Sequence, residues 1–127
     1  MKRFQRVLHR ASLTLITLFL ASCYYDEILD EELPEDTVVS FSLDIQPIFT
    51  NNCIACHPDL EPAIDLRKGT SYTSIVNGVY IVPDSLDASV LYQRLLGNPS
   101  IMPASGSLPS ADIKLVQRWI EQGALNN

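Results

Sequence analysis

The stretch CIACH at residues 53–57 decides how the fold and chemistry of this chain are interpreted. It places two of the three cysteines and one of the two histidines within five positions. With this composition, a C-x-x-C-H pattern arises by accident on the order of once in a thousand chains of 127 residues. The pattern is therefore interpreted as a site with a chemistry of its own.

Three kinds of site contain such a cysteine pair. A structural zinc site needs four ligands, usually two pairs, and the mature chain offers Cys53, Cys56 and His57 with no second pair. A thioredoxin-like dithiol suits an exported protein, but it follows a strand in a βαβ pattern, which this sequence lacks. The remaining interpretation is covalent haem c, in which Cys53 and Cys56 form thioethers and His57 is the proximal iron ligand.

The distal ligand of the iron is predicted by elimination. His9 and Met1 belong to a segment that is expected to be removed on export, so Met102 is the methionine that remains and no second histidine does. Met102 lies 45 residues after His57 in the stretch GNPSIMPASGSLPS, and the proline after it favours extended backbone. A lone methionine is often core filler. Because this loop is polar, ligation of the haem iron is the favoured interpretation.

Residues 1–22 have the features of a lipoprotein signal peptide. Four basic residues come first, and ASLTLITLFLAS then runs for twelve residues without a charge. A helix that crosses a bilayer needs about 20 apolar residues, so cleavage is favoured over a transmembrane span. The run ends in LASC, which resembles the lipobox of bacterial lipoproteins, and Cys23 is expected to be lipidated and to anchor the chain. An ordinary cleavage site beside an incidental cysteine is the alternative.

Residues 23–40 are expected to form a disordered acidic tether, because YYDEILDEELPEDT holds seven acids and no base. The run resembles the acid-rich export signal that some Gram-negative groups place after a lipidated cysteine, and a plain solvated spacer is the alternative. Removal of residues 1–22 leaves five basic and fifteen acidic residues, a net charge of −10. This charge argues against nucleic acid as a partner and favours redox proteins with a basic docking surface.

Residues 41–127 are expected to form one all-α domain of about four helices with long loops. Apolar residues at helical spacing predict the helices, and no alternating strand pattern of any length is present. Asp44, Ser85 and Ser110 are the predicted N-caps. The helices are expected over residues 41–53, 70–76, 85–97 and 110–123. A domain of this size has a marginal core, which favours a cofactor as an additional source of stability.

The chain resembles the class I type monohaem cytochromes c, in particular the small bacterial cytochrome c domains. The resemblance covers residues 41–125 and rests on DIQPIFTNNCIACH, PDSLDASVLYQRL, IMP and LPSADIKLVQRWIEQGA, in this order. It implies that the first and last helices cross near the haem, with Phe49 packed against Trp119, and that the haem edge stays partly exposed for electron exchange. Pro58 departs from the family, which often has a small residue after the histidine.

Several further residues are candidates for contact with the haem. Arg67, Lys68 and Arg94 have the charge to pair with haem propionates, but surface solvation is the favoured interpretation for each. Trp119 is expected in the core, with contact between its N–H and a propionate as the alternative.

The expected function is therefore one-electron transfer by an exported protein that is lipid-anchored through Cys23, on the periplasmic face or the cell surface. Two strong ligands, His57 and Met102, leave the iron no open position, so no enzymatic activity is expected. The alternative is a haem domain with an open or labile distal site, acting as a gas sensor or a peroxidase-like enzyme. No distal His or Arg constellation that would support it is visible. The domain could also serve as a fixed subunit of a larger oxidoreductase.

Overall fold

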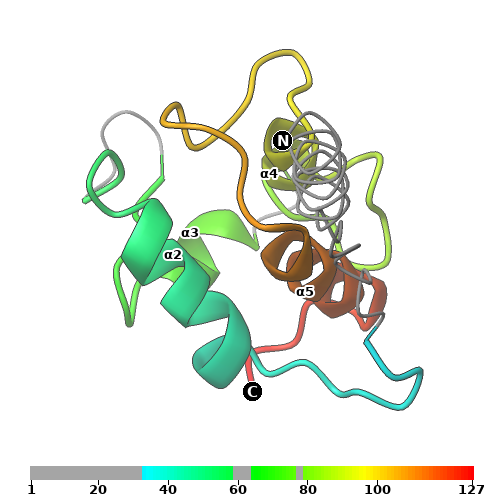
Figure 1. The fold of residues 1–127 in the computed structure, drawn as a ribbon. Helices are drawn as coiled ribbons and strands as arrows, with labels where there is room; N and C mark the ends of the chain where they lie inside the picture. Colours follow the sequence, from blue (N-terminus) through cyan, green and yellow to red (C-terminus); the bar gives the residue numbers. More distant parts are fainter. Residues whose placement is uncertain (1–32, 59–63, 77–78) are drawn as a thin grey trace, which may run out of the picture.

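The computed structural model describes residues 33–58, 64–76 and 79–127, and this part of the chain contains helices and no strand (Figure 1). The elements in chain order are the π-helical turn η1 (Phe41–Ile45) and the helices α2 (Gln46–Asn52), α3 (Ser71–Ile75), α4 (Val90–Leu95) and α5 (Ser110–Glu121). The predicted all-helical class is confirmed for these residues. Long loops join the helices, as expected.

The first predicted helix is divided into η1 and α2, and its cap differs from the prediction. The backbone N–H of Gln46 donates to the carbonyl of Phe41, which makes the first turn π-helical. Ser40 is the N-cap, since its hydroxyl accepts the N–H of Leu43 at 3.3 Å. Asp44 does not cap the helix but accepts the N–H of Ser40 at 2.7 Å. The two side chains thus give hydrogen-bond partners to two backbone N–H groups of the first turn, in the manner of a capping box.

The helix predicted from Ser85 begins later, at Val90. Ser85 lies in an isolated bridge with Val82, and the buried hydroxyl of Ser89 holds this turn together. It accepts the N–H of Val82 at 2.9 Å and donates to the carbonyl of Ser85 at 2.6 Å. These side-chain bonds compete with a helical backbone, so residues 85–89 form turns instead.

The last helix, α5, agrees closely with the predicted range. Ser110, the predicted cap, is the first helical residue, and Pro109 precedes it in extended geometry. The predicted terminator Gly123 has a φ of +86°, a left-handed conformation that suits glycine. α5 therefore begins and ends where proline and glycine require it.

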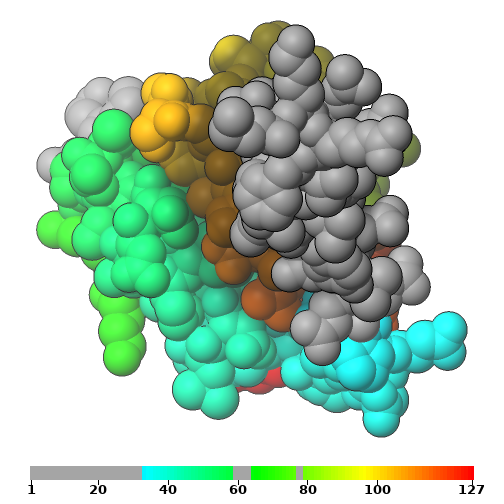
Figure 2. Space-filling model, in the orientation of Figure 1, coloured from blue at the N-terminus to red at the C-terminus, as the bar shows by residue number. Residues whose placement is uncertain are grey.

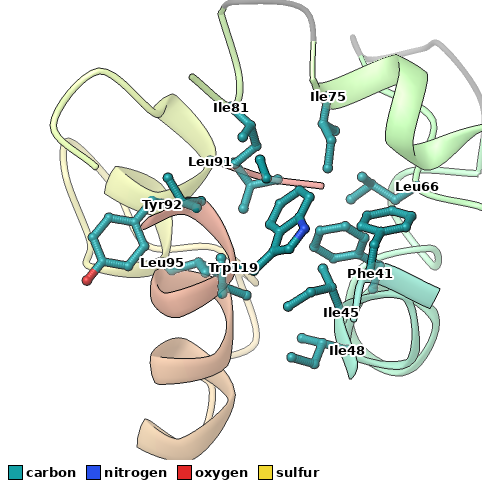
Figure 3. Close-up of a cluster of buried hydrophobic side chains, with 14 of the residues drawn as sticks. Phe41, Ile45, Ile48, Leu66, Ile75, Ile81, Leu91, Tyr92, Leu95 and Trp119 are labelled. Atoms are coloured by element: carbon teal, nitrogen blue, oxygen red, sulfur yellow. The ribbon is translucent and has the colours of Figure 1, made fainter. Parts of the chain in front are cut away.

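The core lies between η1 and α2 on one side and α4 and α5 on the other (Figure 3). Trp119 is fully buried at its centre, and its ring centroid lies 5.3 Å from that of Phe41. Phe41 also meets the ring of Phe49 edge to face, at 6.3 Å. Trp119 thus forms a ring pair with Phe41, and Phe49 joins the same core cluster through its contact with Phe41.

The ordered contacts of the domain begin before residue 41. The side chain of Gln122 accepts the N–H of Val39 at 3.0 Å and donates to the carbonyl of Thr37 at 2.7 Å. Asn127 at the other end of the chain accepts the N–H of Phe41 at 2.8 Å through its side chain. Residues 37–40, which the sequence placed in the tether, therefore lie against α5 and the C-terminus.

The predicted signal peptide, the lipidated Cys23 and the tether as far as residue 32 lie outside the described residues. Among the residues that the structure does describe, no helix combines the length and the apolar character needed to cross a membrane.

Candidate functional site

The CIACH stretch forms one helical turn directly after α2. The N–H of Cys53 donates to the carbonyl of Phe49 at 2.9 Å, which continues the hydrogen bonding of the helix. The N–H groups of Cys56 and His57 both donate to the carbonyl of Cys53, at 3.1 and 3.0 Å. Residues four apart on such a turn are neighbours on one side. The structure therefore brings the three predicted site residues together in a single turn.

The two cysteines of this turn have different surroundings. Cys53 is partly buried and packs against the core, whereas Cys56 is exposed, and the two are not joined by a disulfide. Burial, and the neighbouring Cys56 thiol to a smaller extent, raise the pKa of Cys53 from 9.0 to about 11. Redox-active dithiols have a lowered thiol pKa instead. Cys53 thus lacks the lowered pKa of the attacking thiol in a redox-active dithiol.

His57 has a buried ring nitrogen that lacks a partner within the described residues. Its Nδ1 is shielded from solvent, and no hydrogen bond to it is present. Such an unsatisfied buried group costs about 1–3 kcal/mol, and its retention needs an explanation. The backbone of His57 is held firmly, since its carbonyl accepts the N–H of Leu66 at 3.1 Å. The backbone of His57 is therefore held in place, while Nδ1 of its ring is not engaged by the described residues.

A buried polar network around Gln46 was not predicted from the sequence. Gln46 on α2 donates to the carbonyl of Leu66 at 3.1 Å and accepts the hydroxyl of Ser71 on α3. Gln46 and Ser71 are both buried. The network joins α2, the segment that returns from His57, and α3. A polar side chain between Ile45 and Ile48 on an apolar face was the signal that could have indicated it.

The returning segment is also held by a buried carboxylate. Asp65 accepts bonds from the side chain of Arg67, at 3.0 Å from Nε and 2.7 Å from Nη2. These bonds, together with the backbone N–H of Arg67, hold the pKa of Asp65 well below its usual range. Asp65 donates its own N–H to Ser74 at 2.8 Å. Arg67 is thus paired with Asp65 within its own loop.

Met102 lies on the loop between α4 and α5. Its side chain is 40% exposed, so it does not fill the core. The N–H of Met102 donates to the carbonyl of Arg94 at 3.0 Å, which ties the loop to the end of α4. In Figure 1 this loop arches over the top of the view, and its orange part returns toward the turn after α2. Met102 is thus an available thioether on a loop separate from the CIACH turn.

The core tryptophan is already hydrogen bonded within the protein. The indole N–H of Trp119 donates to the carbonyl of Leu125 at 2.9 Å. The hydroxyl of Tyr72 likewise donates to the carbonyl of Ala124 at 2.9 Å. Trp119 therefore has the core role that was expected, and its N–H is committed to the C-terminal segment.

A polar cavity of about 240 Å³ lies on a different part of the surface. It is lined by Leu33, Glu35, Lys114, Gln117, Arg118 and Glu121. The lining includes none of the predicted site residues. Within the ranges described, no three His, Cys, Asp or Glu side chains gather in a way that could hold a metal ion.

The CIACH turn remains the candidate site with the clearest chemistry. Figure 2 shows its green segment on the face in view, beside the orange part of the loop that follows α4.

Comparison with protein-family models gave no match, and neither the characterised proteins nor the solved structures contained a similar chain. The function is therefore inferred from the residues and their geometry.

Proposed function

We propose that this protein is a c-type cytochrome that carries single electrons. Cys53 and Cys56 bind haem c through thioethers, His57 is the proximal ligand of the iron, and Met102 is the distal ligand. The observation that carries the proposal is the CIACH turn, in which both thiols and an imidazole with an unpartnered buried nitrogen lie within one helical turn.

The burial of the two cysteines and the partly exposed apolar residues of the domain are compatible with a large apolar group. Cys53 reaches the core while Cys56 faces solvent, so a group bound to both would have one buried and one accessible side. Several apolar side chains pack against the core but remain partly exposed. They are Ile54, Val76, Tyr80, Leu86, Ile113 and Leu115. Burial of such surface stabilises a complex by roughly 25 cal/mol per Å².

The haem iron, when bound, supplies a reversible one-electron change. The residues of the chain determine what this change is used for. The carbonyl of His57 accepts the N–H of Leu66, which holds the backbone that carries the proposed proximal ligand. A methionine thioether as the second ligand raises the potential and occupies the position at which a substrate would bind. These roles favour electron transfer over bond chemistry.

The cellular setting belongs to the same proposal. Export to the outside of the cytoplasm suits covalent haem attachment, and lipidation of Cys23 would hold the domain at a membrane surface. The acidic mature chain would meet redox proteins through a basic docking surface on the partner. Permanent association with a larger oxidoreductase is compatible with this arrangement.

A second candidate function follows from the exposure of Met102. Met102 is 40% exposed and lies on a loop outside the core, so its thioether could leave the iron. The site would then act as a gas sensor or a peroxidase-like centre. The strength of the Met102 bond therefore separates the two candidates.

The test is mass spectrometry and absorption spectroscopy of the exported protein, with Met102→Ala as the variant. We expect a mass increase of one haem that denaturation does not remove, and a low-spin reduced spectrum that carbon monoxide leaves unchanged. The variant should bind carbon monoxide and lose the weak long-wavelength band that sulfur ligation gives the oxidised form. Absence of covalent haem contradicts the proposal. Ready binding of carbon monoxide by the wild type favours the second candidate.

A further inference from the structure

We infer that Arg94 is a positioning residue for Met102, an inference that rests on the proposed ligation of the haem iron by Met102. Arg94 lies in the last turn of α4, directly before the loop that carries the methionine. Its backbone and its side chain both bind that loop, at different positions. Surface solvation was expected for Arg94 from the sequence, whereas its side chain is also hydrogen bonded to the loop.

The carbonyl of Arg94 closes the loop on itself. It accepts the N–H of Gly97 at 3.1 Å and the N–H of Met102 at 3.0 Å. Gly97 has a φ of +87°, which lets the chain turn away from the helix and come back. The two ends of the segment from Gly97 to Met102 thus share one acceptor atom, and the backbone of Met102 is fixed relative to α4.

The side chain of Arg94 makes the second attachment. Its Nη1 donates to the hydroxyl of Ser100, two residues before Met102. The neighbouring Gln93 adds to this, since its carbonyl accepts the N–H of Asn98 at 2.9 Å and its side chain accepts the amide of Asn98 at 3.2 Å. Residues 97, 98, 100 and 102 are therefore all bound to the last turn of α4.

This attachment matters because packing restrains Met102 little. At 40% exposure, its side chain receives less restraint from the core than a buried ligand would. A ligand on a loose loop loses conformational freedom when it binds, and this loss weakens the bond. Hydrogen bonds that order the loop beforehand reduce that loss. Arg94 would thus strengthen the bond between Met102 and the iron without touching the iron itself.

The test compares Arg94→Met and Ser100→Ala with Arg118→Met in the haem-loaded protein. Arg118→Met is the matched control, because Arg118 is also a helical arginine, and its Nη1 donates to the carbonyl of Glu35, away from the loop. Ser100 is exposed, so its replacement is not expected to prevent folding. Two measurements are made on each variant: the rate of amide hydrogen exchange at Met102, and the binding of carbon monoxide by the reduced form.

We expect Arg94→Met and Ser100→Ala each to speed exchange at Met102 about fivefold, the factor given by loss of one hydrogen bond of ordinary strength. Both should bind more carbon monoxide and show a weaker sulfur-ligation band. The double variant should be no worse than either single variant, because both remove the same bond. Arg118→Met should behave as the wild type.

Two results overturn the positioning role while the proposed function stands. One is a haem-loaded protein in which both variants keep the exchange rate and the carbon monoxide exclusion of the wild type. The other is an Arg118→Met variant with the same losses, which would indicate general destabilisation. A wild-type chain that lacks covalent haem overturns the proposed function instead, and the positioning role with it.

Discussion

Phe41 and Trp119 lie with their ring centroids 5.3 Å apart, and this contact joins the first helical turn of the domain to its last helix. Both rings are buried, and Phe41 in turn meets Tyr72 at 5.2 Å. The position of a cofactor bound at the CIACH turn would depend on the contact between Phe41 and Trp119, because α2 continues directly from the turn that Phe41 begins. The stability of the whole domain should therefore be sensitive to Phe41.

We expect Phe41→Ala to lower the free energy of unfolding by about 3–5 kcal/mol, the usual cost of removing a buried aromatic ring. Leu43→Ala is the matched control, since Leu43 lies in the same turn but is 77% exposed. This control should change stability by about 0.5 kcal/mol or less. Urea unfolding followed by the fluorescence of Trp119 measures both. Similar losses in the two variants would contradict the packing described for η1.

We expect Asp65→Asn to destabilise the protein at neutral pH and to have less effect in acid. The pKa of Asp65 is lowered in the folded state, so its carboxylate contributes stability above the unfolded pKa of about 3.9. That contribution is lost as the pH falls through the folded pKa. Urea unfolding of wild type and variant across pH 3 to 7 should therefore show a narrowing difference toward acid. The exposed Asp87→Asn serves as control, and a constant difference between Asp65→Asn and wild type would oppose the interpretation.

We expect Gln46→Leu to cost about 1–3 kcal/mol of stability, because it leaves the Leu66 carbonyl and the Ser71 hydroxyl buried without a partner. Amide exchange at Leu66 should also rise, since this N–H donates to the carbonyl of His57. Thr73→Ala is the control, as it removes an exposed hydroxyl bond from the same helix, α3. Protection at Leu66 that survives in the Gln46 variant would show that the network does not support the site.

We expect the two thiols of the CIACH turn, when the chain is produced without haem, to react at different rates with an alkylating reagent. Cys53 is partly buried and its pKa is about 11, so little of it is thiolate near pH 8, and its rate should keep rising as the pH approaches that value. The exposed Cys56 should react first. Mass spectrometry of quenched samples identifies the modified residue. Faster labelling of Cys53 would reopen the dithiol interpretation.

Much of the helical architecture was predictable from local signals. Pro109 and Gly123 mark the two ends of α5. The apolar spacing within the helix predicts the buried face that carries Val116, Trp119 and Ile120. Local signals were less reliable where several polar side chains compete for the same backbone groups. Ser40 caps the first turn in place of Asp44, and Ser89 holds residues 85–89 in turns ahead of α4. Short-range hydrogen bonds of this kind depend on the path of the chain on both sides.

The candidate site, too, was predictable from the sequence only in part. The residues Cys53, Cys56 and His57 follow from the sequence, because their spacing lets one helical turn carry all of them. The pairing of Gln46 with Ser71 does not, because it joins residues 25 positions apart that meet only after α2 and α3 have packed together. The same holds for the attachment of Met102 to Arg94, which depends on where the loop returns.

The sequence by itself therefore determined the helical class and the composition of the CIACH turn, and it predicts Met102 as the methionine that would complete the proposed site. The tertiary structure decided that Phe41 is the ring that meets Trp119, that residues 37–40 pack on α5, and that Arg94 holds the loop of Met102. The physical reason is the range of the interactions. Backbone propensity and motif spacing act over a few residues, whereas these contacts join segments that only folding of the whole domain brings together.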